Sequence, residues 1–265
     1  MSDWAIGFLP GLDAPSLYIL ARPVLAVEEI DRFLKEEDTS WRRTTGAPPA
    51  DELVEFAGRI CYYSFGDQQS RRTTDQYIAN LIGRDHGSVL EHATWTFLLT
   101  GVTRAFTHQL VRHRVGFSYS QLSQQYHEES HARFVEPSPV AANPSVQAQW
   151  RASVVASFTT YRDTLAQLPA MSELDTMRRE QLRRRRAAAR SLLPNAVETK
   201  IVVTANARAL RHFLTQRGGL EGDEEMRVVS ARLLETLRHD APSLFQDFKT
   251  ERLTDGSPIV RAIRA

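Results

Sequence analysis

The residues best suited to chemistry in this chain lie in the segment 103–126, TRAFTHQLVRHRVGFSYSQLSQQY. It contains the triplet Arg112-His113-Arg114, followed by serines, glutamines and tyrosines, and it has no Asp or Glu. Guanidinium, hydroxyl and amide donors without neighbouring carboxylates suit the binding of an anion. A salt-bridged structural segment is the alternative explanation of an arginine triplet alone. The donor-rich residues after the triplet favour the anion site.

Two further groups of arginines could contribute to such a site. Arg183, Arg186 and Arg190 fall on one face of a helix predicted within residues 172–194. The four consecutive arginines at 183–186 are also compatible with a nucleic-acid patch, a nuclear-localisation signal or a solvated helix face.

Arg217 stands at a position of the helix predicted after Asn206 where the apolar spacing requires a hydrophobic residue. A charge directed inward is costly without a partner, so Arg217 requires a buried carboxylate or a bound ligand. Together with the other arginines and the serine and glutamine donors, it indicates a phosphorylated small molecule with a hydrogen-bonding ring, such as a nucleotide.

Other chemistries lack their motifs. The chain has neither GxxxxGK[ST] nor GxGxxG, which argues against an NTPase and a Rossmann dinucleotide fold, and no HExxH or similar spacing, so no metal site is expected. Cys61 is the only cysteine, which excludes an internal disulfide. Ser123 could be a nucleophile, but spacing identifies no base for it, and we interpret it as a hydrogen-bonding serine.

The composition limits the class of protein. The 265 residues are 42% hydrophobic, enough for a full core, and the formal net charge of +1 argues against a general polyanion-binding protein. All basic residues except Lys35, Lys200 and Lys249 are arginine, which suits bidentate phosphate contacts but is also what a GC-rich genome gives. No apolar run approaches about 20 residues and no signal-peptide pattern is present, so we expect a soluble, cytoplasmic protein without membrane contact.

Periodicity predicts helices and strands mixed along the chain, and therefore an α/β protein with one domain. The predicted strands are a short one at 18–20, 86–101 and 198–204. The predicted helices are 51–63, one from Thr73 or Thr74 to Gly83, one from the capping residue Thr103 to about Arg114 followed by an irregular polar loop, 147–168, one opened by Ser172, one capped by Asn206 that ends at Gly218, and one through 226–237. The helix at 147–168 has an apolar stripe that we expect to face the core, made of Trp150, Val154, Phe158, Tyr161, Leu165 and Leu168.

The sequence resembles the flavin-dependent thymidylate synthases. Their signature is an Arg-His-Arg triplet followed at a fixed distance by a serine, and here Arg112-His113-Arg114 precedes SYSQLSQQY. The similarity runs in order from about Leu53 to Phe248, through EFAGRICYYS, HGSVLEHATWTF, RSLLPNAVETKIVVTANARALRHF and the helix end at Gln216-Arg217. Such collinear agreement is far more specific than the triplet alone.

The resemblance implies a single mixed α/β domain over residues 1–265 that forms a homotetramer, with FAD bound where subunits meet. It implies a methyltransferase that takes carbon from methylenetetrahydrofolate, uses NADPH as reductant and methylates C5 of a uridine monophosphate. Reduced flavin then replaces the cysteine nucleophile of the unrelated thymidylate synthase fold, which is consistent with a single Cys61 outside the arginine-rich segment.

The resemblance also implies roles for individual residues. Arg217 would stabilise charge at the O2/N3 edge of uracil, Arg190 would bind the phosphate, and Ser123 would orient the ring. The residues expected to contact FAD are Ser64, His92, Thr94, Arg112, His113, Arg114, Asn206, Arg208 and His212. The residues expected to hold the nucleotide are Gln109, Gln121, Ser123, Gln124, Gln125, Arg190 and Arg217.

Three departures from the family pattern stand out. Eight residues, 115–122, separate the triplet from Ser123, one more than in the family; Gln125 replaces an arginine; and Glu221 stands where a histidine is common. We hypothesise that the altered pocket accepts a ribose 2′-hydroxyl, so that UMP is methylated as well as, or instead of, dUMP, as by the UMP C5-methylase of polyoxin-type nucleoside antibiotic pathways. The alternatives are a strict dUMP enzyme, a catalytically idle flavin-binding relative, and a nucleic-acid-binding module, which the near-neutral charge disfavours.

Overall fold

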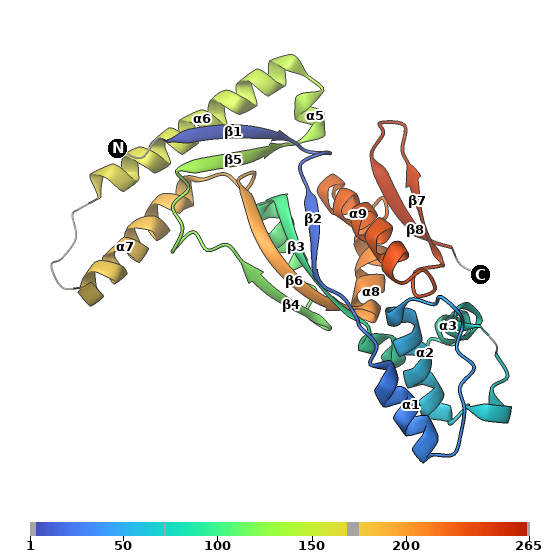
Figure 1. Ribbon diagram of the computed structural model, residues 1–265. Helices are drawn as coiled ribbons and strands as arrows, with labels where there is room; N and C mark the ends of the chain where they lie inside the picture. Colours follow the sequence, from blue (N-terminus) through green and yellow to red (C-terminus); the bar gives the residue numbers. More distant parts are fainter. Residues whose placement is uncertain (1–3, 72, 169–174, 264–265) are drawn as a thin grey trace. The chain divides into compact units, whose positions relative to one another are not determined.

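The computed structural model of the chain describes residues 4–71, 73–168 and 175–263. The fold is mixed α/β, as the sequence predicts (Figure 1). The chain is divided between two compact units, each built from segments that are distant in sequence. The first comprises Met1–Ser16, Leu99–Arg112 and Ser120–Val202, and the second Leu17–Leu98, His113–Tyr119 and Val203–Ala265.

The core of the first unit forms between a strand pair and a long helix. Strand β1 (Ala5–Pro10) runs parallel to β5 (His131–Glu136), and both lie beside α6 (Pro144–Gln167) (Figure 1). The predicted apolar stripe of α6 faces this core, because Val154, Phe158, Tyr161 and Leu165 are buried against Phe134. The unit also contains α4 (Arg104–Leu110), α5 (Ser138–Ala141), α7 (Asp175–Ala189) and the 3-10 turn η3 (Arg190–Leu192).

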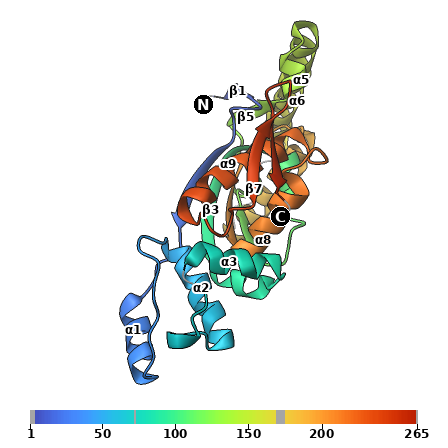
Figure 2. The ribbon, with the colours of Figure 1, turned by 90° about the vertical axis from the view of Figure 1, so that its right-hand side faces the viewer.

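The second unit is mainly helical. Its antiparallel hairpin, β7 (Phe248–Arg252) with β8 (Pro258–Ala262), lies beside α9 (Glu224–Asp240) in both ribbon views (Figures 1 and 2). The other elements are α1 (Val27–Glu36), α2 (Pro49–Tyr62), η1 (Gly66–Gln68), α3 (Thr74–Gly83), η2 (Gly87–His92) and α8 (Ala207–Arg217). Within the part of the chain that the structure describes, no helix is both long and apolar enough to cross a membrane.

The remaining four strands form one sheet with the order β2-β3-β6-β4. Their bounds are Ser16–Ala21 for β2, Thr94–Thr103 for β3, Glu198–Asn206 for β6 and Phe117–Gln121 for β4. Along most of β3 and β6 every second residue is buried, and the hydroxyls of Thr96 and Thr204 pair at 2.9 Å. The loops and helices that follow these strands carry most of the candidate site.

A glycine of β3, Gly101, allows the segment around Ala14 to pass close to this strand. Gly101 has φ +68°, and a β-carbon there would lie 1.9 Å from the Ala14 carbonyl oxygen. Its N–H donates to the buried Glu198 at 2.9 Å, and Glu198 also pairs with Arg133 of β5. Gly7 of β1 lies opposite Arg133 in the strand pair. Strands β1, β3, β5 and β6 therefore all meet around Glu198 and Arg133.

Two predicted capping residues are confirmed. The N–H of Phe106 donates to Thr103 Oγ1 at 2.9 Å, and the N–H of Ala209 donates to Asn206 Oδ1 at 2.9 Å. Both bonds satisfy a donor of the first helical turn that has no partner within the helix. They set where α4 and α8 begin. The predicted opening of the preceding helix at Ser172 lies outside the described residues.

Three expectations about secondary structure are wrong. The strand expected over 86–101 begins only at Thr94, because the residues before it form η2, which buries the neighbours Val89 and Leu90 together. The helix expected to reach Arg114 ends at Leu110. The polar segment after it is strand β4 rather than an irregular loop, because β6 supplies a hydrogen-bonding partner.

Candidate functional site

Arg104 is the first residue of α4, and with Arg190, whose charge acts on it, it makes up what we call the cationic group of the first unit. Its Nη2 donates to the Leu122 carbonyl at 2.8 Å, while its buried Nε has no partner among the described residues. Burial lowers the pKa of Arg104, the charge of Glu129 opposes that shift, and the positive charge of Arg190 adds to it. Two guanidinium groups that act on each other in a half-buried site provide a place for an anion.

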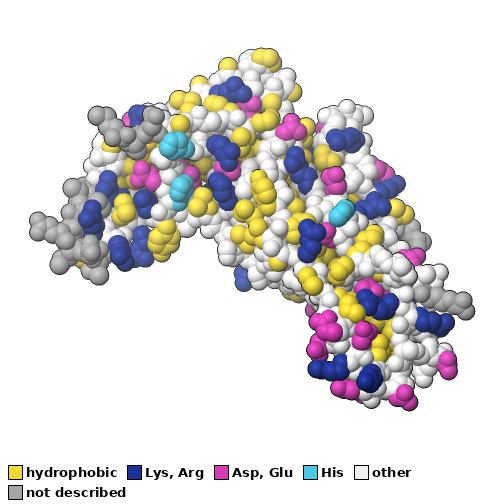
Figure 3. All heavy atoms as spheres, viewed as in Figure 1, with side chains coloured by type: hydrophobic (Ala, Val, Ile, Leu, Met, Phe, Trp, Pro, Cys, Tyr) yellow, Lys and Arg dark blue, Asp and Glu magenta, His cyan; other side chains and the backbone are white. Residues whose placement is uncertain are grey.

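The arginines of α7 approach the same segment. Arg186 donates from Nη1 to the Tyr126 carbonyl at 2.8 Å, and its Nη2 lies 4.0 Å from a Glu128 oxygen. A hydrogen bond with the Tyr126 side chain raises the pKa of Arg183, and Glu180 adds to this shift. Lys and Arg side chains gather over α7 on the molecular surface (Figure 3). The α7 face is therefore partly engaged with residues that follow Ser123 and is not only a solvated surface.

The polar residues after β4 form a tight turn. Ser123 accepts the main-chain N–H groups of Tyr126 and His127 at its carbonyl, and its Oγ accepts the N–H of Gln125 at 3.3 Å. Gln121 donates from Nε2 to Thr107 at 3.0 Å. No hydrogen bond joins the Ser123 hydroxyl to a histidine side chain or a carboxylate among the described residues, which agrees with a hydrogen-bonding role.

In the second unit, His113 and Arg217 are direct neighbours. Nε of Arg217 donates to Nε2 of His113 at 3.0 Å, and no other hydrogen bond of this guanidinium is found among the described residues. The pKa of His113 is lowered by burial, by the positive charge of Arg217 and by the neighbouring His212. His113 is therefore a neutral acceptor. The inward charge predicted for Arg217 meets an imidazole rather than a buried carboxylate, and its remaining nitrogens can bind a ligand.

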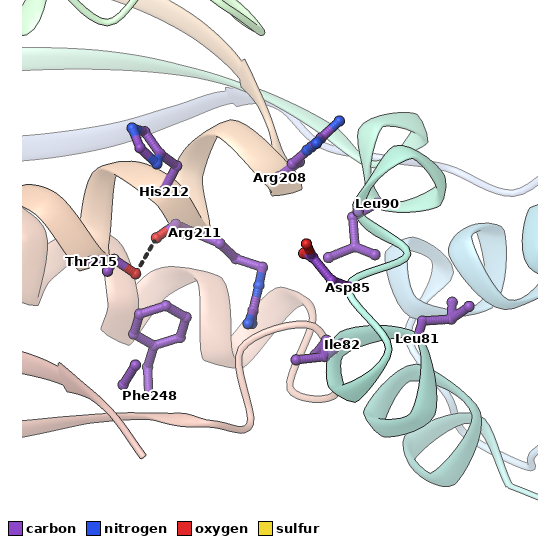
Figure 4. Close-up of a pocket in the computed structure, with 11 residues that line it drawn as sticks. Leu81, Ile82, Asp85, Leu90, Arg208, Arg211, His212, Thr215 and Phe248 are labelled. Carbon is purple, nitrogen blue, oxygen red and sulfur yellow. Dashed lines mark hydrogen bonds between the residues drawn. The ribbon is translucent and has the colours of Figure 1, made fainter. Parts of the chain in front are cut away.

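A pocket of about 340 Å³ borders two of the predicted flavin contacts (Figure 4). Arg208 and His212 line it from α8, together with Arg211. Arg211 is held by both oxygens of Asp247 at 2.6 and 2.7 Å and stacks over Phe248, so its role is structural. The other lining residues are Leu81, Ile82, Asp85, Gly87, Leu90, Thr215, Phe248 and Ala262. The mixture of apolar and polar walls suits a ring system.

The remaining predicted flavin contacts do not line this pocket. Ser64 lines another cavity of about 140 Å³, and a hydrogen bond with its side chain partly offsets the burial that raises the pKa of Tyr77. His92 and Thr94 are exposed, at the end of η2 and the start of β3. Arg112 and Arg114 are both exposed, and Nη2 of Arg112 lies 3.3 Å from Nε2 of His108.

The predicted residues divide between the two units by ligand. Six of the nucleotide contacts lie in the first unit, Arg217 being the exception, and eight of the flavin contacts lie in the second, Arg112 being the exception. Gln109 lies on α4, and Asn206 uses its side-chain oxygen to cap α8.

Sequence reasoning missed three residues near the predicted nucleotide contacts. Arg104 is visible in the sequence as a cation of the central segment, and its place directly after the helix cap could have identified it. Thr107 and Glu129 carry no such signal, because their contacts with Gln121 and Gln124 depend on the folded chain.

Comparison with known proteins identifies relatives of the chain. A family model described as thymidylate synthase complementing protein matches residues 44–243. The chain is 42% identical over 231 residues to the flavin-dependent thymidylate synthase of Mycobacterium avium (strain 104), covering 86% of this chain and 90% of the relative. It is 43% identical over 230 residues to that of Mycobacteroides abscessus, with the same coverage of 86% and 90%.

A solved structure has a similar fold. It is the UMP/dUMP methylase PolB from Streptomyces cacaoi bound with 5-Br UMP, with a TM-score of 0.63 and 19% sequence identity. The match covers 91% of this chain and 95% of that chain. The structural likeness therefore shows the fold alone, and the sequence comparisons show the family.

Proposed function

This chain belongs to the thymidylate synthase complementing protein family, that of the flavin-dependent thymidylate synthases, and on this premise we propose the details of its reaction. As a member it is a methyltransferase that uses a flavin and acts on C5 of a uridine nucleotide. We propose that the flavin is FAD, that methylenetetrahydrofolate donates the carbon, and that NADPH is the reductant.

The observation that carries the proposed nucleotide site is the buried Nε of Arg104, which has no partner among the described residues. The positive charge of Arg190 acts on the pKa of Arg104, both side chains are partly buried, and the family resemblance implies that Arg190 binds phosphate. A phosphate between them would relieve their mutual repulsion and satisfy the buried Nε of Arg104. The neighbouring residues Gln109, Gln121, Ser123, Gln124 and Gln125 would then hold the sugar and base.

The residues of the second unit fit a flavin. The pocket beside Arg208 and His212 has walls suited to a ring, and Ser64 lines a second cavity in the same unit. The proposed contacts are Ser64, His92, Thr94, Arg112, His113, Arg114, Asn206, Arg208 and His212. When bound, reduced flavin supplies the reducing equivalents of the methylation.

Arg217 is the proposed catalytic group of the protein itself. Its Nε is fixed on neutral His113, so the two terminal nitrogens are held in place for the O2/N3 edge of uracil. Donors fixed before the reaction stabilise charge that develops on the ring without further reorganisation. Ser123 would orient the ring, because its hydroxyl is itself positioned by the Gln125 N–H.

We further propose that UMP is accepted as well as, or instead of, dUMP. The extra residue before Ser123 is accommodated in a turn, in which Phe117 N–H donates to the Arg114 carbonyl at 3.2 Å and Gly116 has φ +73°. Gln125 lacks the charge of the usual arginine. Both changes alter the nucleotide-binding segment. A strict dUMP enzyme and an idle relative remain the alternatives.

The test is tritium release from C5-labelled UMP and dUMP with purified protein, methylenetetrahydrofolate and NADPH. We expect a visible flavin spectrum and release from UMP at a rate comparable with or above that from dUMP. A strong preference for dUMP would reject the ribonucleotide assignment. A flavin-bound protein without turnover would identify an idle relative, and a flavin-free protein whose polyanion binding depends steeply on salt would favour nucleic acid.

We also propose that the chain forms one domain of the family type, assembles as a homotetramer with sites at subunit interfaces, and works in the cytoplasm. Sedimentation of the purified protein at micromolar concentration tests the assembly. A species with the mass of one chain would reject it.

A further inference from the structure

The amide of Gln124 is oriented by a buried carboxylate. Nε2 of Gln124 donates to Oε1 of Glu129 at 3.2 Å, and both residues are only 6% exposed. A carboxylate offers acceptors only, so the amide nitrogen must face Glu129 and the carbonyl oxygen must face away from it. Glu129 is itself anchored, since its main-chain N–H donates to the Tyr161 hydroxyl at 3.1 Å.

Gln121 is oriented in the same sense by a threonine. Its Nε2 donates to Thr107 Oγ1 at 3.0 Å and lies 3.4 Å from Thr199 Oγ1. The Thr107 hydroxyl donates its own hydrogen to the Arg104 carbonyl at 3.1 Å, so its oxygen is left as an acceptor. Thr107 is 2% exposed and has little freedom to rearrange. The carbonyl oxygen of Gln121 is therefore also turned away from its fixed partner.

Two glutamines of one segment thus present acceptors beside a cationic group. A nucleoside monophosphate carries its charge on the phosphate, which arginines bind, whereas its sugar hydroxyls are donors that need acceptors. A ribose has adjacent 2′- and 3′-hydroxyls, and a deoxyribose has only the second. We infer that the carbonyl oxygens of Gln121 and Gln124 accept from the sugar hydroxyls, that Glu129 and Thr107 are the positioning residues that fix this polarity, and that the arrangement favours ribose.

This inference rests on the proposed function and deepens it. Glu129 also acts on the charge of Arg104, so replacing it alters phosphate binding. That effect is common to UMP and dUMP and cancels in the ratio of their affinities. Loss of a contact with the 2′-hydroxyl affects UMP alone. If the two carbonyl oxygens instead faced N3–H of uracil, both nucleotides would weaken equally, so the ratio separates sugar from base recognition.

The experiment measures Kd for UMP and dUMP by calorimetry, together with kcat/KM for each, in the full-length holoprotein and two pairs of variants. Glu129→Gln replaces the carboxylate with an amide that can donate as well as accept, so Gln124 can rotate, while Glu129→Asp keeps an acceptor. Thr107→Val removes the hydroxyl, while Thr107→Ser keeps it. The two pairs act on different glutamines, and if Glu129→Gln does not fold, Gln124→Met removes the same acceptor directly.

We expect the ratio of UMP to dUMP affinity to fall about three- to tenfold in whichever of Glu129→Gln and Thr107→Val frees the glutamine that accepts from the 2′-hydroxyl, the effect of one lost hydrogen bond. In the other variant the glutamine on the 3′-hydroxyl is freed, and both nucleotides should weaken together. Thr107→Ser should keep the wild-type ratio, and Glu129→Asp should restore most of it. A wild-type ratio in both Glu129→Gln and Thr107→Val, with both proteins folded and still turning over both nucleotides, would overturn the inference and leave the proposed function standing. A wild-type preference for dUMP would also overturn it. A wild-type protein that binds neither nucleotide would overturn the proposed function itself.

Discussion

Replacing Arg59 by methionine should strongly destabilise the protein. Arg59 and Glu55 are each 1% exposed and form an ion pair at 2.6 Å on α2. The Arg59 guanidinium also donates to the carbonyls of Ser64 and Arg71 and lies over the Tyr77 ring at 4.5 Å. It therefore holds the main chain of Ser64, a proposed flavin contact, against α2.

The magnitude follows from what the substitution leaves behind. Arg59→Met leaves the Glu55 carboxylate buried, with the Trp41 indole N–H at 3.2 Å as its remaining donor among the described side chains. An uncompensated buried charge costs about 3–5 kcal/mol. For a chain of this size each kcal/mol lowers Tm by about 2–4 °C, so we expect a decrease of about 10 °C. Urea and thermal unfolding measure it, and flavin content reports the effect on Ser64.

A matched control is available on α1. Arg32 pairs with Glu29 at 2.5 Å, but the two side chains are 66% and 55% exposed, so Arg32→Met should cost less than about 1 kcal/mol. The double variant Glu55→Leu/Arg59→Met removes both charges and should recover much of the stability lost in Arg59→Met. If Arg59→Met is no less stable than Arg32→Met, the buried pair does not contribute in the way described.

Three other predictions concern the site. Arg104→Met should weaken UMP binding by about 10- to 100-fold in calorimetry, because a charge-assisted hydrogen bond to the phosphate is lost. Arg184 is exposed, and Arg184→Met should bind UMP like the wild type; equal effects of the two substitutions would contradict the placing of Arg104 in the phosphate site. The pKa of His113 is lowered in the folded protein, so the unfolded chain binds this proton more readily than the folded one. The free energy of unfolding should therefore fall as the pH drops below about 6.5. If urea unfolding of His113→Gln shows the same dependence on pH as the wild type, His113 is not the cause. Gly116→Ala should lower the free energy of unfolding by about 1–3 kcal/mol, because φ is +73° and the added β-carbon would lie 2.8 Å from that of Ala209. At Gly83 the added β-carbon meets open space, so Gly83→Ala is the control. Equal stability of the two variants would contradict backbone strain at Gly116.

Local signals in the sequence predicted much of the fold. The caps at Thr103 and Asn206 and the apolar stripe of α6 depend on residues a few positions apart, and all three are confirmed. Strand β4 depends on a neighbour about 80 residues later in the chain, so its own polar sequence did not reveal it. The hairpin of β7 and β8 was missed as well, although Asp255-Gly256 is a turn signal.

In the candidate site, too, local features could be predicted from the sequence, whereas contacts between distant residues could not. Arg217 was identified because it interrupts an apolar spacing, and the structure shows it bound to His113. That its partner is a neutral imidazole could not be predicted, because His113 is 104 residues away in sequence. The orientation of Gln124 depends on burial of Glu129, which no periodicity indicates. Spacing therefore predicts which residues face inward, and only the folded chain shows what each of them contacts.

The way Ala14 passes over Gly101 has a practical consequence for shortened forms of the protein. The family model matches from residue 44, and a fragment cut there would lack β1 and the Ala14 segment. Strand β5 would then expose a row of unpaired main-chain groups, which favours edge-to-edge aggregation. Expression trials should therefore retain the first strand, and a fragment that begins at residue 44 should be recovered mainly in inclusion bodies.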